Sequence, residues 1–162
     1  MKQEHIQPIA ISGAVITVTT TRTEETDTSG KTIQAILTGA QIPVRHYAVI
    51  PDQIEAIRRE LYQALKTCNC IIINGGTGLT HDDCTIEAVA PLLEKKIDGF
   101  GELFRLKSYD EIGTSTMLSR AIAGTICGRV VFCIPGSTPA VTLATKTLIV
   151  PEIPHILSHA NK

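Results

Sequence analysis

Short stretches of β-branched residues alternate with helix-like stretches over the first ninety residues of this 162-residue chain. The pattern predicts strands at residues 9–18, 44–50 and 70–73, since each run is short and rich in Val and Ile. Between them, residues 29–40 and a segment that begins at residue 51 repeat apolar side chains at helical spacing. Strands that alternate with helices indicate βαβ units. We therefore expect an α/β fold with a mostly parallel sheet.

The second half of the chain has a less regular pattern. It contains in turn a glycine-rich segment, a helix, a strand and a last helix, at residues 98–105, 115–124, 130–134 and 140–148. No repeat, low-complexity tract or linker divides the sequence. We therefore expect a single domain over residues 1–162, with a short N-terminal tail at residues 1–8.

Composition argues against several classes of function. Fifteen basic and sixteen acidic residues give a net charge of -1, which does not favour nucleic acid or an anionic membrane as a partner. The longest apolar stretch, residues 9–18, is far shorter than the ~20 residues that span a bilayer. Five cysteines without zinc-ligand spacing indicate buried free thiols in a reducing compartment. Because the N-terminus does not resemble a secretory signal, we expect a soluble, cytoplasmic protein.

A glycine-rich loop follows the third expected strand and precedes a helix start at residue 85. Its sequence is Asn74-Gly75-Gly76-Thr77-Gly78, continued by Leu79-Thr80-His81-Asp82-Asp83. Glycines leave backbone N–H groups uncovered, and the helix N-terminus behind them favours negative charge, so the loop could hold a phosphate. The loop lacks the lysine of a Walker A motif and the third glycine of a dinucleotide fingerprint. The alternative is a tight turn without a ligand.

A second turn of small residues follows the strand expected at residues 130–134. It consists of Pro135, Gly136 and Ser137. Open α/β sheets bind ligands beyond the carboxyl ends of their strands, so this turn and the glycine loop would face one crevice with residues 19–21 and 51–52. Alternatively, the serine only caps the final helix.

Asp52 and Asp83 each allow two interpretations. Asp52 could begin a capping box with Glu55, and Asp83 could cap the helix behind the glycine loop. Alternatively, either carboxylate could bind Mg²⁺, which prefers carboxylate oxygens together with substrate phosphate oxygens. Two phosphate-binding loops and two aspartates at one sheet edge would make a site for phosphoryl transfer. Such a site works through positioning and charge neutralisation.

Two further features could contribute to a site. Residues 99–105 place an aromatic between two glycines and then an acid and a base, in the sequence Gly99-Phe100-Gly101-Glu102-Leu103-Phe104-Arg105. This composition suggests a shaped surface for a planar ligand or a contact between subunits. His81 is either a ligand or acid–base group, or an ordinary histidine in a solvated loop.

In their order along the chain, these segments resemble the molybdenum cofactor biosynthesis family that contains molybdopterin adenylyltransferase and biosynthesis protein B. The resemblance extends over nearly the whole chain, with matching segments at residues 21–30, 51–52, 75–85, 99–105, 118–121, 135–137 and 148–155. It implies a three-layer α/β/α fold that assembles as a homotrimer or homohexamer. It also implies attack by the molybdopterin phosphate on the α-phosphate of Mg-ATP, which gives adenylylated molybdopterin and pyrophosphate.

The same resemblance implies roles for individual residues. Asp52 and Asp83 match the catalytic acids, and Asp83 would also bind Mg²⁺. The phosphates of the nucleotide or the pterin would be bound by Gly75, Gly76, Thr77 and Gly78. The pocket would be completed by Glu102, Pro135, Gly136 and Ser137. The implied partners are molybdopterin, ATP and the molybdate-inserting protein of the pathway.

Two loops of this chain depart from the family's usual pattern. The glycine loop usually ends in Arg-Asp, whereas this chain has Asp82-Asp83. The first loop often reads Ser-Asp-Thr-Arg, and residues 19–22 here read Thr-Thr-Thr-Arg. An acid in place of a cation weakens the attraction for a triphosphate, although a second carboxylate favours Mg²⁺. The alternative function is therefore a catalytically weak, oligomeric carrier of molybdopterin or nucleotide.

Overall fold

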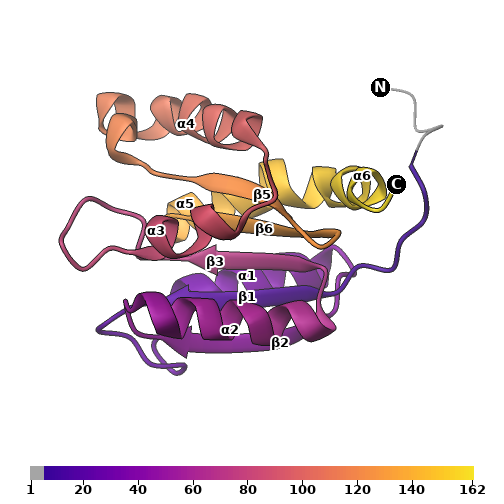
Figure 1. Cartoon of the computed structure of the whole chain (residues 1–162). Helices are drawn as coiled ribbons and strands as arrows, with labels where there is room; N and C mark the ends of the chain where they lie inside the picture. The colour runs from indigo at the N-terminus through magenta and orange to yellow at the C-terminus, as the bar shows by residue number, and fades with distance from the viewer. Residues whose placement is uncertain (1–5) are drawn as a thin grey trace.

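The computed structural model describes residues 6–162 as a six-stranded sheet between two layers of helices (Figure 1). The strands are β1 (Gly13–Val18), β2 (Val44–Ile50), β3 (Cys70–Asn74), β4 (Lys95–Lys96), β5 (Ile122–Ile126) and β6 (Arg129–Ile134). They lie in the order β2-β1-β3-β6-β5-β4. The first four of these run parallel, whereas β5 pairs antiparallel with both β6 and β4. The prediction of a mostly parallel sheet is confirmed.

Six α-helices in the described part of the chain pack on the sheet. They are α1 (Thr28–Gly39), α2 (Ile54–Thr67), α3 (Thr85–Val89), α4 (Asp98–Ile112), α5 (Thr138–Ala144) and α6 (Val150–Ala160). The 3₁₀ helices η2 (Ala90–Leu92) and η3 (Gly113–Leu118) follow α3 and α4, and the π-helix η4 (Thr145–Ile149) joins α5 to α6. Within residues 6–162, every helix is too short or too polar to cross a membrane.

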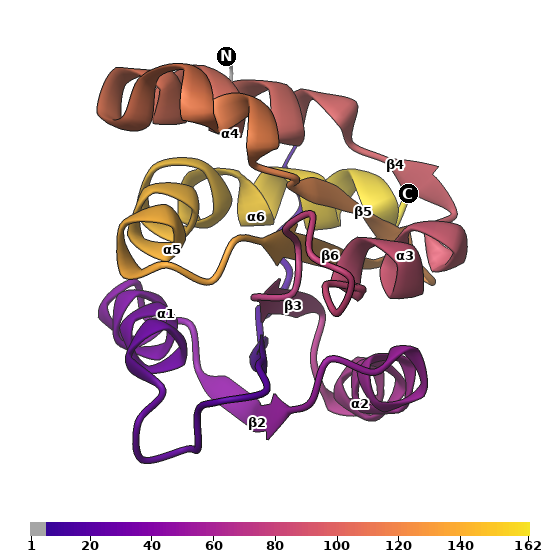
Figure 2. The same cartoon turned by 90° about the vertical axis from the view of Figure 1, so that its left-hand side faces the viewer.

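The central strands are buried on both faces. In β1, Val15 belongs to a core cluster that includes residues of α1, α4, α5 and α6, whereas Ala14 and Ile16 belong to a second cluster that includes residues of α2 and α3. Ile72 and Ile71 of β3 divide between the two faces in the same way. Figure 2 shows α1, α5 and α6 on one side of the sheet and α2 and α3 on the other. Because side chains alternate along a strand, burial on two faces explains the nearly continuous apolar runs.

The start of α1 is fixed by a buried carboxylate. Asp27 is the N-cap, and its Oδ1 accepts the Gly30 N–H at 2.9 Å. Its Oδ2 accepts the hydroxyls of Thr17 in β1 at 2.7 Å and Tyr47 in β2 at 2.6 Å. Burial opposes the charge, but these hydrogen bonds outweigh burial and hold the pKa of Asp27 below its ordinary value. Asp27 therefore ties α1 to the carboxyl end of β1 and to the middle of β2.

The expectation of a helix over residues 115–124 is wrong. This stretch forms η3 and then β5, which pairs with β6 through a hairpin. The two turn residues, Cys127 and Gly128, have φ of 47° and 74°, the left-handed conformations that a tight hairpin requires. Pairing with β6 thus outweighs the local helix propensity. Cys127 is exposed at this turn, so the expectation of buried thiols is wrong there, although all five cysteines are free.

Residues 99–105 do not present an aromatic ring to a ligand. They lie in the first part of α4, where Phe100 is buried. Its ring packs against Phe132 of β6, with centroids 5.0 Å apart. The aromatic of this segment belongs to the core and is not free to stack on a ligand.

The remaining boundaries differ by a few residues. The first strand begins at Gly13, four residues after its expected start, and the last expected helix continues through η4 and α6. Residues 6–8 of the expected tail have no regular structure, and residues 1–5 lie outside the described residues.

Replacing Gly30 with alanine tests the packing of the Asp27 cap. An added Cβ would lie 2.0 Å from Asp27 Oδ2 and 2.6 Å from Thr17 Oγ1. We expect Gly30→Ala to lower the free energy of unfolding by about 2–4 kcal/mol in urea denaturation, because the cap and its buried partners would separate. The control is Gly39→Ala in the same helix, where the new Cβ meets nothing within 4 Å. Equal stabilities of the two variants would contradict this account.

Candidate functional site

The carboxyl ends of β1, β3 and β6 open onto a cleft of about 500 Å³. The glycine loop lines it through residues 74–78 and Asp83, and residues 135–137 line it beside that loop. Residues 17–19 of the first strand and its loop complete this edge. Figure 1 shows the glycine loop projecting from the strand ends, at the end of the molecule away from the C-terminus. The prediction of one shared crevice is confirmed for the glycine loop, residues 135–137 and the first loop, but it is wrong for residues 51–52, which do not line the cleft.

The carbonyl groups of the glycine loop are all held by the protein. Thr85, at the start of α3, donates its hydroxyl to the Gly75 carbonyl at 2.8 Å and its N–H to the Gly76 carbonyl at 2.9 Å. Arg120 donates to the next two carbonyls, those of residues 77 and 78, at 2.8 Å each. These bonds fix the orientation of four consecutive peptide groups.

The N–H groups of the same peptides remain available. A trans peptide directs its N–H away from its carbonyl oxygen. Within residues 6–162, the N–H groups of residues 76–79 donate to no protein acceptor. Residues 76–78 also line the cleft. A run of free N–H groups is what an oxyanion such as phosphate requires, so the phosphate interpretation has support that a ligand-free turn would not provide.

Two glycines let the glycine loop and the turn at residues 135–137 approach each other. Gly75 has φ of 90°, and a Cβ there would lie 2.3 Å from the Val18 carbonyl oxygen. A Cβ on Gly136 would lie 3.0 Å from the Gly75 Cα. Larger residues at these positions would push β1, β3 and β6 apart at their ends, so the cleft depends on both glycines.

Neither aspartate caps a helix, so the capping interpretations of Asp52 and Asp83 are wrong. The N-caps of α2 and α3 are Gln53 and Cys84. Asp83 Oδ2 instead accepts the N–H and the hydroxyl of Thr80, at 3.0 and 2.8 Å, and so closes the end of the glycine loop.

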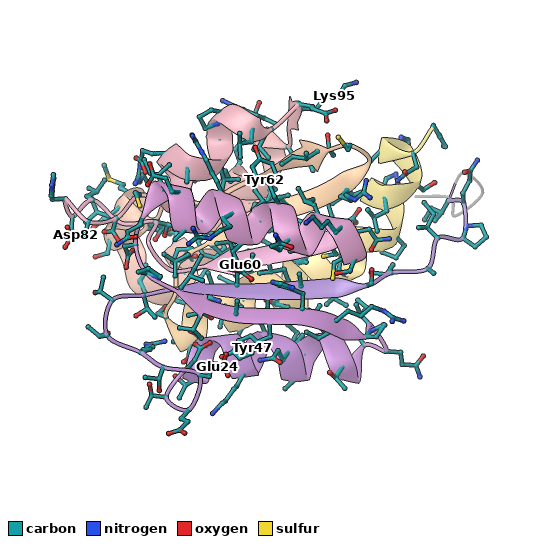
Figure 3. All side chains as sticks on the ribbon, turned by 60° about the horizontal axis from the view of Figure 1, so that its bottom comes forward. Glu24, Tyr47, Glu60, Tyr62, Asp82 and Lys95 are labelled. Carbon is teal, nitrogen blue, oxygen red and sulfur yellow. The ribbon has the colours of Figure 1, made fainter. Side chains whose placement is uncertain are left out.

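Asp52 lies behind the glycine loop. A Cβ on Gly76 would be 2.9 Å from its Oδ1, although Asp52 itself does not line the cleft. Burial raises the pKa of Asp52, and repulsion from Asp83 and Asp82 raises it further. Figure 3 shows Asp82 at the outer end of its loop. Three carboxylates therefore lie close enough to interact, one of them, Asp83, on the cleft itself.

The acidic residues are too few to enclose a metal ion by themselves, so a magnesium ion here would also need ligands from water or substrate. Within residues 6–162, no group of three or more His, Cys, Asp or Glu side chains is arranged to hold a metal ion. Mg²⁺ commonly takes one or two protein carboxylates and completes its shell with water and substrate phosphate oxygens. Asp83 lines the cleft and Asp52 lies behind the glycine loop, so these two residues are the candidate ligands.

Arg22 is a cleft residue that the sequence pattern does not single out. Its Nη1 donates to Ser29 Oγ at 2.9 Å, and Ser29 Oγ donates to Asn74 Oδ1 at 3.0 Å. Asn74 Nδ2 in turn donates to Thr17 Oγ1 at 2.9 Å. Arg22 is the positively charged residue among those lining the cleft in the described chain. Its only sequence signal is its position in the first loop, residues 19–22, which shows neither the buried network nor the direction of the guanidinium.

Of the other residues predicted to belong to the site, one lines the cleft and two do not. Ser137 lines the cleft and also caps α5, since its Oγ accepts the Ala140 N–H at 3.3 Å. His81 is exposed in the glycine loop. Glu102 is exposed on α4 and lines a separate hollow beside β5. The expectation that Glu102 completes the phosphate cleft therefore does not hold within one chain.

The sequence has close relatives. The family profile described as "Probable molybdopterin binding domain" matches residues 14–155. The chain is 45% identical over 168 residues to molybdenum cofactor biosynthesis protein B of Staphylococcus carnosus, and the match covers 99% of each protein. The chain belongs to this family.

Solved structures of the family have the same fold. A crystal structure of molybdenum cofactor biosynthesis protein B is 46% identical with a TM-score of 0.91, and the match covers 96% of this chain and 98% of that one. The tungsten cofactor synthesizing protein MoaB of Pyrococcus furiosus is 37% identical with a TM-score of 0.87, covering 96% and 100%. The three-layer α/β/α fold implied by the resemblance is therefore confirmed.

The repulsion among the carboxylates can be measured directly. We expect Asp83→Asn to lower the pKa of Asp52, because it removes the strongest charge that acts on it. Asp82→Asn should lower it less. Carboxyl chemical shifts followed by NMR during a pH titration give the value, with Asp110→Asn on α4 as a distant control. An unchanged Asp52 pKa in Asp83→Asn would show that the two groups do not interact.

Proposed function

We propose that this protein adenylylates molybdopterin with Mg-ATP. Its family supports the broader assignment to molybdenum cofactor biosynthesis. The finer assignment rests on one observation above all, the four free N–H groups of residues 76–79 beside Asp83 and Asp52. This combination suits a reaction between two phosphate groups.

The reaction needs no nucleophile from the protein. An oxygen of the pterin phosphate attacks the α-phosphorus of ATP, and the bond from that phosphorus to the pyrophosphate oxygen breaks. Adenylylated molybdopterin and pyrophosphate are the products. The protein contributes by placing the two phosphates in line and by neutralising their charge.

The residues of the cleft divide this work between them. The N–H groups of residues 76–79 and the guanidinium of Arg22 would hold phosphate oxygens. Asp83 and Asp52 would hold Mg²⁺, which supplies charge neutralisation at the phosphates when bound. The raised pKa of Asp52 would then fall, because a cation favours the carboxylate form.

Asp82 favours a second candidate function. This exposed acid adds negative charge beside a site for anionic substrates, where the family usually has an arginine. A protein with that change could retain binding of molybdopterin or nucleotide and act as an oligomeric carrier with little turnover. Product formation distinguishes the two functions.

The test of the proposed activity combines purified protein, Mg-ATP and molybdopterin. We expect pyrophosphate and adenylylated molybdopterin to appear in equal amounts. Asp83→Asn should lower kcat by about 10²–10³-fold, because it removes a ligand of the Mg²⁺ that would neutralise the reacting phosphates. Asp110→Asn is the matched control and should leave kcat unchanged. Tight pterin binding without product would reject the enzyme and favour the carrier, and full activity of Asp83→Asn would reject its assigned role.

We also propose that the chain assembles into a homotrimer or homohexamer through the outer face of α4 and η3. Large apolar side chains are exposed there, namely Leu103, Leu106, Tyr109, Ile112, Met117 and Leu118. An apolar patch of this kind on a small domain marks a protein contact. Since Leu118 also lines the cleft, such a contact would lie beside the site.

A charge placed on that face should break the assembly. We expect Leu106→Glu, at a side chain that is 67% exposed, to shift the wild-type oligomer to a monomer in light scattering after gel filtration. Tyr62→Glu on α2, at a side chain that is 49% exposed, is the control and should leave the oligomer intact. A monomeric wild type would contradict the proposed assembly.

A further inference from the structure

Arg120 connects three segments that are distant in the sequence. It lies between η3 and β5, and its Nε and Nη2 donate to the carbonyl oxygens of Thr77 and Gly78 at 2.8 Å each. Its Nη1 and Nη2 also donate to the carboxylate of Glu87 in α3, at 2.5 and 3.3 Å. The guanidinium thus fastens the glycine loop to the helix that follows it.

The contacts of Arg120 are directed away from the cleft. Its neighbour Ser119 lines the cleft, but Arg120 does not. Its charge is paired with Glu87, whose own pKa is lowered by the hydrogen bond from Arg120. Arg120 therefore does not serve as the cation that meets a bound phosphate, which is the position of Arg22.

The effect of Arg120 on a ligand passes through the peptide groups. A planar trans peptide fixes its N–H opposite its carbonyl, so two bound carbonyls set the direction of the N–H groups of Gly78 and Leu79. Glycine peptides reorient easily when nothing holds them. The rigid fork of an arginine can hold two adjacent carbonyls at once, whereas a lysine offers a single point of attachment.

We propose that Arg120 is a positioning residue that aims the N–H groups of the glycine loop at a bound phosphate, with Glu87 holding its guanidinium in place. The catalytic part of this inference rests on the proposed adenylyl transfer. The binding part does not, because it concerns any phosphate in the cleft.

The variant that isolates geometry from charge is Arg120→Lys. We expect its Kd for pyrophosphate, measured by calorimetry, to rise about tenfold or more, because two of the four N–H groups lose their orientation. The kcat for adenylyl transfer should fall about a hundredfold, the scale of loss that follows a misplacement of roughly 1 Å. In NMR spectra, the amide signals of residues 78 and 79 should shift or broaden.

Arg129→Lys is the matched control. Arg129 Nε and Nη1 likewise donate to two backbone carbonyls, those of Leu65 at 2.9 Å and Cys127 at 2.7 Å. It lines a different hollow and not the phosphate cleft. We expect Arg129→Lys to leave pyrophosphate binding, kcat and the amides of residues 78 and 79 as in the wild type.

The outcomes separate this inference from the proposed function. Wild-type binding without turnover would reject adenylyl transfer, while the binding and NMR data would still decide the role of Arg120. Wild-type values in Arg120→Lys for binding and for both amides would overturn the inference. If that variant does not fold, Glu87→Gln replaces it, with an expected rise in Kd of about threefold. An unchanged Kd in Glu87→Gln would then overturn the inference.

Discussion

The in-register parallel pairing of β1, β3 and β6 is the constraint on which the site depends. Asn74, the last residue of β3, is paired with Thr17 on one side and with Ile134 on the other. The three strands therefore end together, and the turns that leave them meet. Gly75 and Gly136 allow this meeting at backbone distance, while Asn74 joins Thr17 by a hydrogen bond. The cleft follows from the ends of the sheet and needs no separate domain.

Charge in this region is divided between buried and exposed groups. Asp27 is buried, and its carboxylate form is favoured because two hydroxyls and an N–H donate to it. Its role is to hold the start of α1 against the sheet. Asp52 is not surrounded by donors in this way, and burial together with repulsion from Asp83 and Asp82 raises its pKa. Free N–H groups stand beside this acidic edge. The proposed function uses both features, the N–H groups for the phosphates and the carboxylates for Mg²⁺.

Sequence patterns identified the features whose physics is local. The glycine loop, the turn at residues 135–137 and the strand at residues 44–50 each carry their signal within a few adjacent residues. The prediction of a helix over residues 115–124 was wrong because pairing with β6 stabilises β5, and local propensity does not include such pairing. The capping roles of Asp52 and Asp83 failed for a related reason. Each helix starts one residue later than the aspartate would require, and the side chains turn toward the loop.

The sequence by itself determined the α/β class, the two small-residue turns and their place at one edge of the sheet. Apolar strand patterns and glycine-rich turns are each recognisable from a few adjacent residues. Only the tertiary structure decided which groups of those turns face a ligand. The carbonyls of residues 75–78 are held by Thr85 and by Arg120, which lies more than forty residues further along the chain. A hydrogen bond across that separation leaves no local pattern. The direction of the free N–H groups is therefore a property of the folded chain alone.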